Sequence, residues 1–215
     1  MDRSLATRAV FALVAVIGVG CATPGVEPDK YYPSDWPAIV LGGDCQSLQR
    51  TYKNKGVLVD EKGERSAIWL TDLFGKRRAP QEVIDARVAL RRFKYATVKI
   101  EPGTPHSRSP DPRWNIVLEL SHGRPGVFSA DSEPNAVLKL TPLSNDRALG
   151  IGGWCQNGTL FGFGSETLGV GYTGCGLASA TDRSLVVKCV HRLAGVAVVV
   201  PVFISDHFWS RFEPE

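Results

Sequence analysis

The stretch Ser184–Ile204, which reads S-L-V-V-K-C-V-H-R-L-A-G-V-A-V-V-V-P-V-F-I, decides the fold class. Every second residue from Leu185 to His191 would share one face of a strand, and a period of two is typical of a half-buried β-strand. The run Val196–Ile204 is apolar on both faces, which favours a central strand. We expect Gly195 to turn this strand back on the preceding one, so the sequence predicts an antiparallel pair here.

Working outward, the same alternation occurs in two earlier segments, residues 114–120 and 136–140. Further short strands are predicted at Val57–Val59, Val98–Glu101 and Thr159–Phe163. Helix is sparse. Ser66 could cap a short helix that ends at Gly75, and its apolar stripe is Trp69, Leu70, Leu73 and Phe74. Pro80–Arg92 predicts a second helix with proline at its first position. Regular short strands with few helices predict a mainly β fold: an antiparallel sheet, sandwich or partly closed barrel with one or two short helices.

The composition is that of a globular protein and gives no sign of a nucleic-acid partner. The 215 residues are 43% hydrophobic and 22% charged, as in an ordinary globular protein. Gly and Pro are frequent, but there is no repeat and no low-complexity block. The formal net charge of +3 is too small to indicate a nucleic-acid partner.

The N-terminus has the three parts of an export signal. Arg3 and Arg8 precede an uncharged apolar run, Ala9–Val19, which is too short to span a membrane as a helix. Gly20 and Cys21 follow directly. Residues 1–20 are therefore predicted to be a signal peptide.

The segment around Cys21 resembles the lipobox of bacterial lipoproteins. Val19 and Gly20 match the family pattern, whereas Gly18 stands where an aliphatic residue is usual. The resemblance implies a diacylglycerol thioether and an acyl chain on Cys21, and two or more chains make anchoring stable. Ala22, which is not Asp, implies sorting to the outer membrane, facing the periplasm. An uncleaved signal anchor and a secreted protein are the alternatives.

Residues 21–40 are interpreted as the lipidated cysteine and a proline-rich tether, and residues 41–215 as one β-rich globular domain. Residues 22–30 would be a free linker, since four prolines between residues 22 and 40 oppose a helix. Tyr31, Tyr32 and Trp36 are unusual in a linker. They indicate either that the segment packs back on the domain or that it offers aromatic contacts to envelope lipid or glycan.

The five cysteines divide into one plus four. Cys21 is assigned to lipid, which leaves Cys45, Cys155, Cys175 and Cys189 in an oxidising compartment. Three pairings are open to four cysteines. Cys175 and Cys189 lie on either side of an expected turn at residues 181–183, which favours Cys175–Cys189 and Cys45–Cys155. A metal site is disfavoured because the chain has no CxxC or HxxH spacing.

Motifs for catalysis are weak. Gly169–Gly174 matches GxGxxG, but no acidic residue follows near position 194, so we interpret it as a glycine-rich turn and expect no nucleotide or other cofactor. Ser165 lacks the flanking glycines of a nucleophile elbow. The remaining candidates are His106, His122, His191 and the pair Asp206–His207, whose neighbouring side chains would point to opposite faces of a strand.

The strongest charge cluster lies between residues 76 and 94. It includes Arg77, Arg78, Arg91 and Arg92, and it is either a solvated face or a contact for anionic lipid or an acidic partner.

The mature part is also weakly similar to small uncharacterised bacterial lipoproteins, in Asp44–Leu48 with Tyr52 and in Trp209–Phe212. We expect a lipid-anchored envelope protein of binding or structural type, with an envelope protein or glycan as partner. An envelope hydrolase acting on esters or glycans is the alternative.

Overall fold

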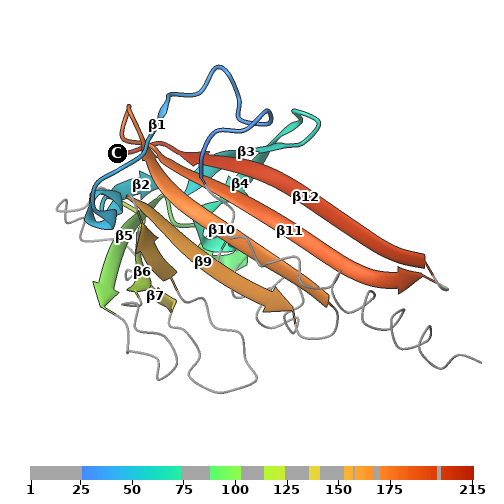
Figure 1. Ribbon diagram of the computed structural model, residues 1–215. Helices are drawn as coiled ribbons and strands as arrows, with labels where there is room; N and C mark the ends of the chain where they lie inside the picture. The colour runs from blue at the N-terminus through green and yellow to red at the C-terminus, as the bar shows by residue number, and fades with distance from the viewer. Residues whose placement is uncertain are drawn as a thin grey trace, which may run out of the picture.

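The computed structural model describes residues 26–73, 88–102, 114–123, 136–140, 153–156, 158–166, 170–197 and 200–215. Its architecture is mainly antiparallel β, as the sequence predicts (Figure 1). In chain order the elements are β1 Ile39–Val40, the 3-10 helix η2 Cys45–Leu48, β2 Thr51–Lys53, β3 Lys55–Asp60, β4 Arg65–Trp69, α2 Leu70–Leu73, β5 Tyr95–Pro102, β6 Trp114–Ser121, β7 Ala136–Leu140, β8 Gly153–Gln156, β9 Thr159–Glu166, β10 Val170–Ala180, β11 Leu185–Ala197 and β12 Val200–Phe212.

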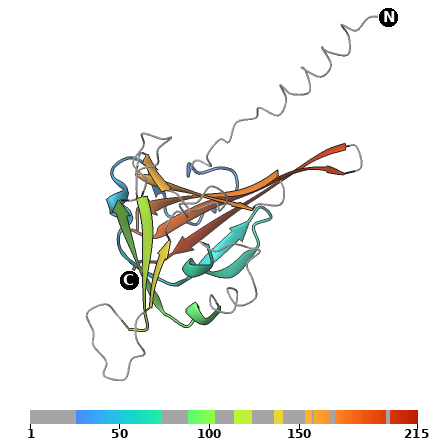
Figure 2. The same cartoon turned by 90° about the horizontal axis from the view of Figure 1, so that it is seen from below.

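These strands form one curved sheet in the order β2-β5-β6-β8-β9-β10-β11-β12-β3-β4, with β1 added to β10 and β7 added to β6. The three longest strands, β10 to β12, run side by side and extend past the shorter ones (Figures 1 and 2). The chain end bridges back to β2 at Tyr52–Pro214, and the Lys53 N–H donates to the Glu213 carbonyl at 2.9 Å. This bridge curls the described part of the sheet toward its edge strand β2, while β2 and β4 remain the two ends of the strand order.

The main core lies on the concave side of this sheet. Its largest fully buried side chains come from strands far apart in the sequence, and they include Tyr52, Leu118, Leu185 and Phe212. Gly56 allows β3 to approach β12 closely, because a Cβ at this position would lie 2.6 Å from the Phe212 ring. Burial of these apolar side chains is the principal stabilising contribution.

The alternation predicted for β11 is confirmed where side chains are described. Leu185, Val187 and Cys189 belong to the main core. Val186 belongs to a second apolar cluster on the opposite face of the sheet, and its neighbour at the next outward position, Lys188, is 9% exposed. Both faces of this part of β11 are thus covered.

The turn between the last two strands lies beyond Gly195, so the prediction for this glycine is wrong. β11 continues through Gly195 to Ala197, and Val196–Ile204 is not a single strand, because β12 begins at Val200. Pro201 pairs with Val196 inside the ladder. A continuous apolar run carries no periodic signal that marks where a chain reverses, which explains the misplacement.

The glycine-rich segment 169–174 is also not a turn. From Val170 onward it forms β10, which pairs with β9 on one side and β11 on the other. Hydrogen bonding to two neighbouring strands overrides the weak strand preference of glycine.

Helices are short, as predicted, but Ser66 does not cap one. Ser66 lies within β4 opposite Leu58, and α2 begins only at Leu70. In the predicted helix Pro80–Arg92, residues 88–90 are helical and residues 74–87 lie outside the described part. The additional helix η2 is capped by Asp44, whose carboxylate accepts from the Gln46 N–H at 3.0 Å. No helix in the described part of the chain is long and apolar enough to cross a bilayer.

The cysteines lie in the two predicted pairs. Cys45 in η2 is bonded to Cys155 in β8, with 5.9 Å between their Cα atoms. Cys175 and Cys189 are register partners in β10 and β11, with 4.1 Å between their Cα atoms. The first bond ties η2 to β8, and the second joins two neighbouring strands.

Candidate functional site

The outer face of the sheet is covered by the N-terminal strap, which we define as residues 26–40. Within the strap Val26 and Trp36 are buried, and they join an apolar cluster that also contains Val59, Ala178, Ala180, Val186 and Trp209. The prediction that this aromatic segment packs back on the domain is thus confirmed. The packing begins at Val26, so the interpretation of residues 22–30 as a free linker is wrong from that residue onward.

A partly buried polar contact holds the strap to β11 and β12. The Asp29 carboxylate accepts from the Lys188 ammonium at 2.8 Å, from the Trp209 indole N–H at 3.1 Å and from the Tyr31 N–H at 2.9 Å. The Lys188 ammonium also lies 5.1 Å from the Trp209 ring centroid. We call Asp29, Lys188 and Trp209 the strap latch.

The latch stabilises the ionised form of Asp29. Burial by itself raises the pKa of this carboxyl, but the hydrogen bonds from Lys188, Trp209 and the Tyr31 N–H outweigh burial, so its pKa lies below the ordinary 3.8. Lys188 is buried whereas the Asp29 side chain is 26% exposed, so each charge is partly withdrawn from water and is compensated by the other.

Aromatic contacts extend the latch along the strap. The Tyr32 ring meets Trp209 edge-on at 4.9 Å and Trp36 at 5.9 Å. Its hydroxyl donates to the Pro37 carbonyl, and burial raises the pKa of that hydroxyl. The ring centroids of Tyr31 and His207 lie 5.8 Å apart, and the backbone N–H of His207 donates to the Glu61 carboxylate at 2.7 Å. The strap therefore lies along the sheet through specific contacts on several residues.

Replacing Asp29 by Asn should loosen the strap. At neutral pH we expect the free energy of unfolding to fall by about 1 kcal/mol, which is a typical interaction energy between two residues in contact. The folded-state pKa of Asp29 is lowered, so its stabilisation is fully present above the ordinary value of 3.8 and is lost as pH falls through the folded value. The variant and the natural chain should therefore converge in acid, as measured by urea unfolding across pH.

Limited trypsin digestion gives a local measure of the same change. Lys30 is exposed and directly follows Asp29, so the Asp29→Asn chain should be cut after Lys30 faster than the natural chain. Asp35→Asn is the matched control, because Asp35 pairs with Arg65 at the surface, where ion pairs contribute little. Equal cleavage rates for the two variants would contradict the role given to the latch.

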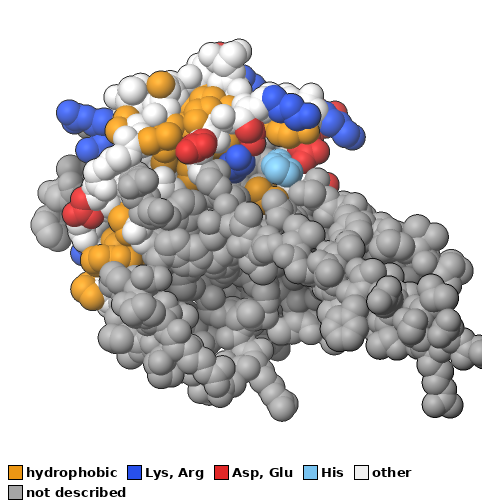
Figure 3. Space-filling model, viewed as in Figure 1, with side chains coloured by type: hydrophobic (Ala, Val, Ile, Leu, Met, Phe, Trp, Pro, Cys, Tyr) orange, Lys and Arg blue, Asp and Glu red, His pale blue; other side chains and the backbone are white. Residues whose placement is uncertain are grey.

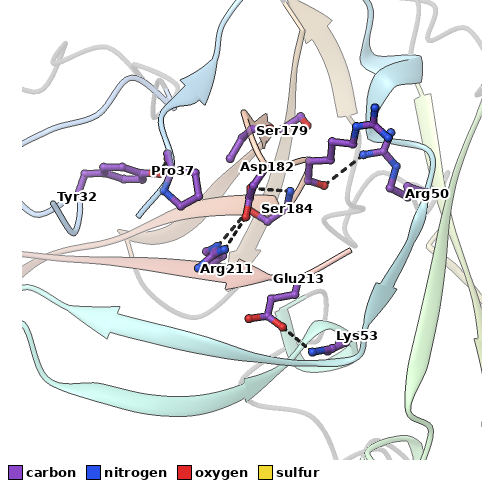
Figure 4. A network of polar contacts seen from close by, with 11 residues as sticks. Tyr32, Pro37, Arg50, Lys53, Ser179, Asp182, Ser184, Arg211 and Glu213 are labelled. Carbon is purple, nitrogen blue, oxygen red and sulfur yellow. Dashed lines mark hydrogen bonds and ion pairs between the residues drawn. The ribbon is translucent and has the colours of Figure 1, made fainter. Parts of the chain in front are cut away.

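A second polar network lies beside the strap, at the turn between β10 and β11, where the Thr181 N–H donates to the Ala38 carbonyl at 2.9 Å (Figure 4). The Asp182 carboxylate accepts from the Ser184 N–H and hydroxyl and from Arg211. Burial raises the pKa of Asp182, but these hydrogen bonds outweigh it and lower the pKa overall. The Arg183 carbonyl accepts from Arg50, and Lys53 pairs with Glu213 at 2.5 Å. This network closes the turn predicted at residues 181–183.

The described backbone pairs one base candidate with an acid, His191 with Asp206, and leaves the nucleophile candidate Ser165 two strands away from His191. Ser165 in β9 pairs with Tyr172 and through it with Arg192, whereas His191 pairs with Asp206 in the adjacent register row. β10 lies between β9 and β11. The backbones of β9 and β11 are therefore two strand spacings, about 10 Å, apart, which is farther than a hydrogen bond spans.

Two of the remaining histidines lie in the described part of the chain. His122 follows β6 with its ring 4.4 Å from Phe93, and His207 lies beside the strap. His106 lies outside the described residues. Among the described residues no three His, Cys, Asp or Glu side chains are grouped as metal ligands.

Arg91 and Arg92 in the predicted basic region have partners within the chain. The Arg91 guanidinium pairs with Asp72 at 2.8 Å and lies 4.6 Å from the Trp69 ring centroid, and Arg92 lies 5.3 Å from the Phe93 ring centroid. Arg77 and Arg78 lie outside the described residues. On the side viewed in Figure 3, the described surface carries both charge signs. Contact with an anionic surface stays a prediction.

Sequence reasoning missed the latch. The available signal was Lys188, a charged residue between Val187 and Cys189 in the otherwise apolar first half of β11. A buried lysine needs a carboxylate partner, but the chain has 22 acidic residues, and nothing local singles out Asp29.

Comparison of the chain with protein families, with curated proteins and with solved structures finds no match.

Proposed function

We propose that this protein is a lipid-anchored component of the bacterial cell envelope, attached through Cys21, with a binding or structural role. The observation that carries the proposal is the division of the cysteines. Cys45, Cys155, Cys175 and Cys189 are bonded in pairs. Cys21 is left over, and it follows a basic segment and a short apolar run, as in a lipoprotein signal.

The strap supports a structural role for the region after the anchor. Because Val26 is 2% exposed and packs on the sheet, only residues 22–25 separate a lipid on Cys21 from a fixed point on the domain. In this proposal the domain is held close to the bilayer, and an outer-membrane location follows from Ala22. The partner would then be an envelope component within short reach of the membrane.

Mass spectrometry of the N-terminal peptide from the membrane fraction tests the anchor. We expect the mature chain to begin at Cys21 with a diacylglycerol thioether, and we expect Cys21→Ser to abolish both cleavage at Gly20 and lipid addition. Ala22→Ser is the matched control, because it leaves the cysteine in place. An unmodified Cys21 in the natural protein would contradict the proposal.

A further inference from the structure

The β11–β12 hairpin reaches beyond the rest of the described sheet. Its register pairs run from Leu185–Phe212 to Ala197–Val200. β3 accompanies β12 only up to Phe208, and β10 accompanies β11 only up to Ala194. Figures 1 and 2 both show the end of this hairpin projecting from the body. We define residues 195–197 and 200–202 as the hairpin tip; among the described residues its two segments have only each other as ladder partners.

The tip has the composition of a segment that leaves water. Residues 193–204 read L-A-G-V-A-V-V-V-P-V-F-I, without a charged or hydrogen-bonding side chain. The first polar register pair is Arg192–Ser205, and His191–Asp206 follows toward the body. A strand pair that is apolar at both parities has no polar face for water, so an apolar environment is needed at this end.

The backbone at the tip exposes few hydrogen-bond donors. Pro201 has no backbone N–H. Its place in the ladder therefore costs no hydrogen bond only if the backbone nitrogen of residue 201 points away from β11. His207 has the same parity, and its N–H indeed leaves the β11 ladder to reach Glu61 at 2.7 Å. The outward donor that β12 would present in the tip is therefore absent. This lowers the penalty for placing the tip among acyl chains, where unsatisfied backbone groups are costly.

The expected lipid lies at the base of the same hairpin. Val26 packs with Val186 of β11 and Trp209 of β12. Five residue steps from Val26 to Cys21 span at most about 17 Å. From Phe208, where pairing with β3 ends, the eight residue steps to Val200 reach about 27 Å further. An acyl chain on Cys21 and the tip can thus meet one bilayer while the body remains in water.

We infer that the hairpin tip is a second membrane contact, which enters the boundary between headgroups and acyl chains of a phospholipid bilayer beside the lipid on Cys21. This inference rests on the proposed anchor. Shallow entry suits the structure. At that depth water still reaches the backbone N–H and C=O groups that point away from the partner strand, such as those of Val196.

Photocrosslinking tests the contact in the full-length, natively processed protein. Benzoylphenylalanine would replace Val200 in the tip or, as the matched control, Lys99, an exposed position in β5, a strand that neither pairs with the hairpin nor belongs to the strap cluster. The protein would be placed in vesicles of phosphatidylethanolamine and phosphatidylglycerol. We expect lipid adducts from position 200 and none from position 99.

The same sample separates the two proposals. Lipidated Cys21 without lipid adducts at position 200 overturns the tip contact and leaves the anchor intact. Unmodified Cys21 with lipid adducts at position 200 overturns the anchor alone. In intact envelopes, adducts from position 200 to a protein in place of lipid would show a protein-docking site and overturn the membrane contact.

Discussion

Removing the Cys45–Cys155 bond by the double substitution Cys45→Ala and Cys155→Ala is expected to lower the free energy of unfolding by about 5 kcal/mol. The bond closes a loop over a sequence separation of 110, and in the chain-entropy model a longer loop confers more stability. Loss of about 5 kcal/mol is a large part of the total for a domain of this size. Urea unfolding of the oxidised proteins measures it.

The second disulfide is the matched control for this prediction. Cys175–Cys189 closes a sequence separation of only 14, for which the same model gives about 3 kcal/mol. Alanine in both pairs avoids placing a hydroxyl at the buried Cys45 and Cys189 positions. A larger loss from the Cys175–Cys189 pair than from the Cys45–Cys155 pair would contradict the entropic account.

Truncating Trp209 to alanine should cost about 3–5 kcal/mol, as for other buried large aromatic side chains. Trp209 is fully buried between the strap and the sheet, where it contacts Tyr32 and donates to Asp29. Its loss leaves a cavity, an underpacked strap and one hydrogen bond fewer on the Asp29 carboxylate. We expect a lower urea midpoint together with faster trypsin cleavage after Lys30.

Two variants separate the packing of Trp209 from its hydrogen bond. Trp209→Phe keeps most of the ring and removes the indole N–H, so a loss of about 2 kcal/mol is expected for a bond to a charged group. Trp69→Ala removes an indole that is only half-buried in β4 and should leave cleavage after Lys30 unchanged. If Trp69→Ala released the strap as readily as Trp209→Ala, the latch would not be the cause.

Strand positions were predictable where apolar and polar residues alternate in the sequence. β6 and the first half of β11 show such a period of two, because alternate side chains point to opposite faces of the sheet. No such alternation marks β10, where glycines remove the side-chain pattern, or the residues near Gly195, where every residue is apolar. In both places the hydrogen-bonded neighbours, rather than local preference, determine the backbone.

The candidate site was only partly predictable. Tyr31, Tyr32 and Trp36 indicated that the segment after Cys21 packs on the domain, because large aromatic residues in a linker need burial. The residues that receive the strap could not be identified in the same way. Asp29 and Lys188 meet only when β11 is in register with β12 and the strap crosses both, and no sequence period records that crossing.

The sequence by itself determined the mainly antiparallel β class, the favoured cysteine pairs and the prediction of an anchor at Cys21. These follow from local chemistry: alternation, the separation of Cys175 from Cys189 around a turn, and an apolar run that ends at a cysteine. The tertiary structure alone decided that β11 and β12 carry clusters on both faces, that Asp29 closes the strap on Lys188, and that the apolar hairpin extends past its neighbouring strands. These depend on contacts between residues far apart in the chain, whose energies have no local signature.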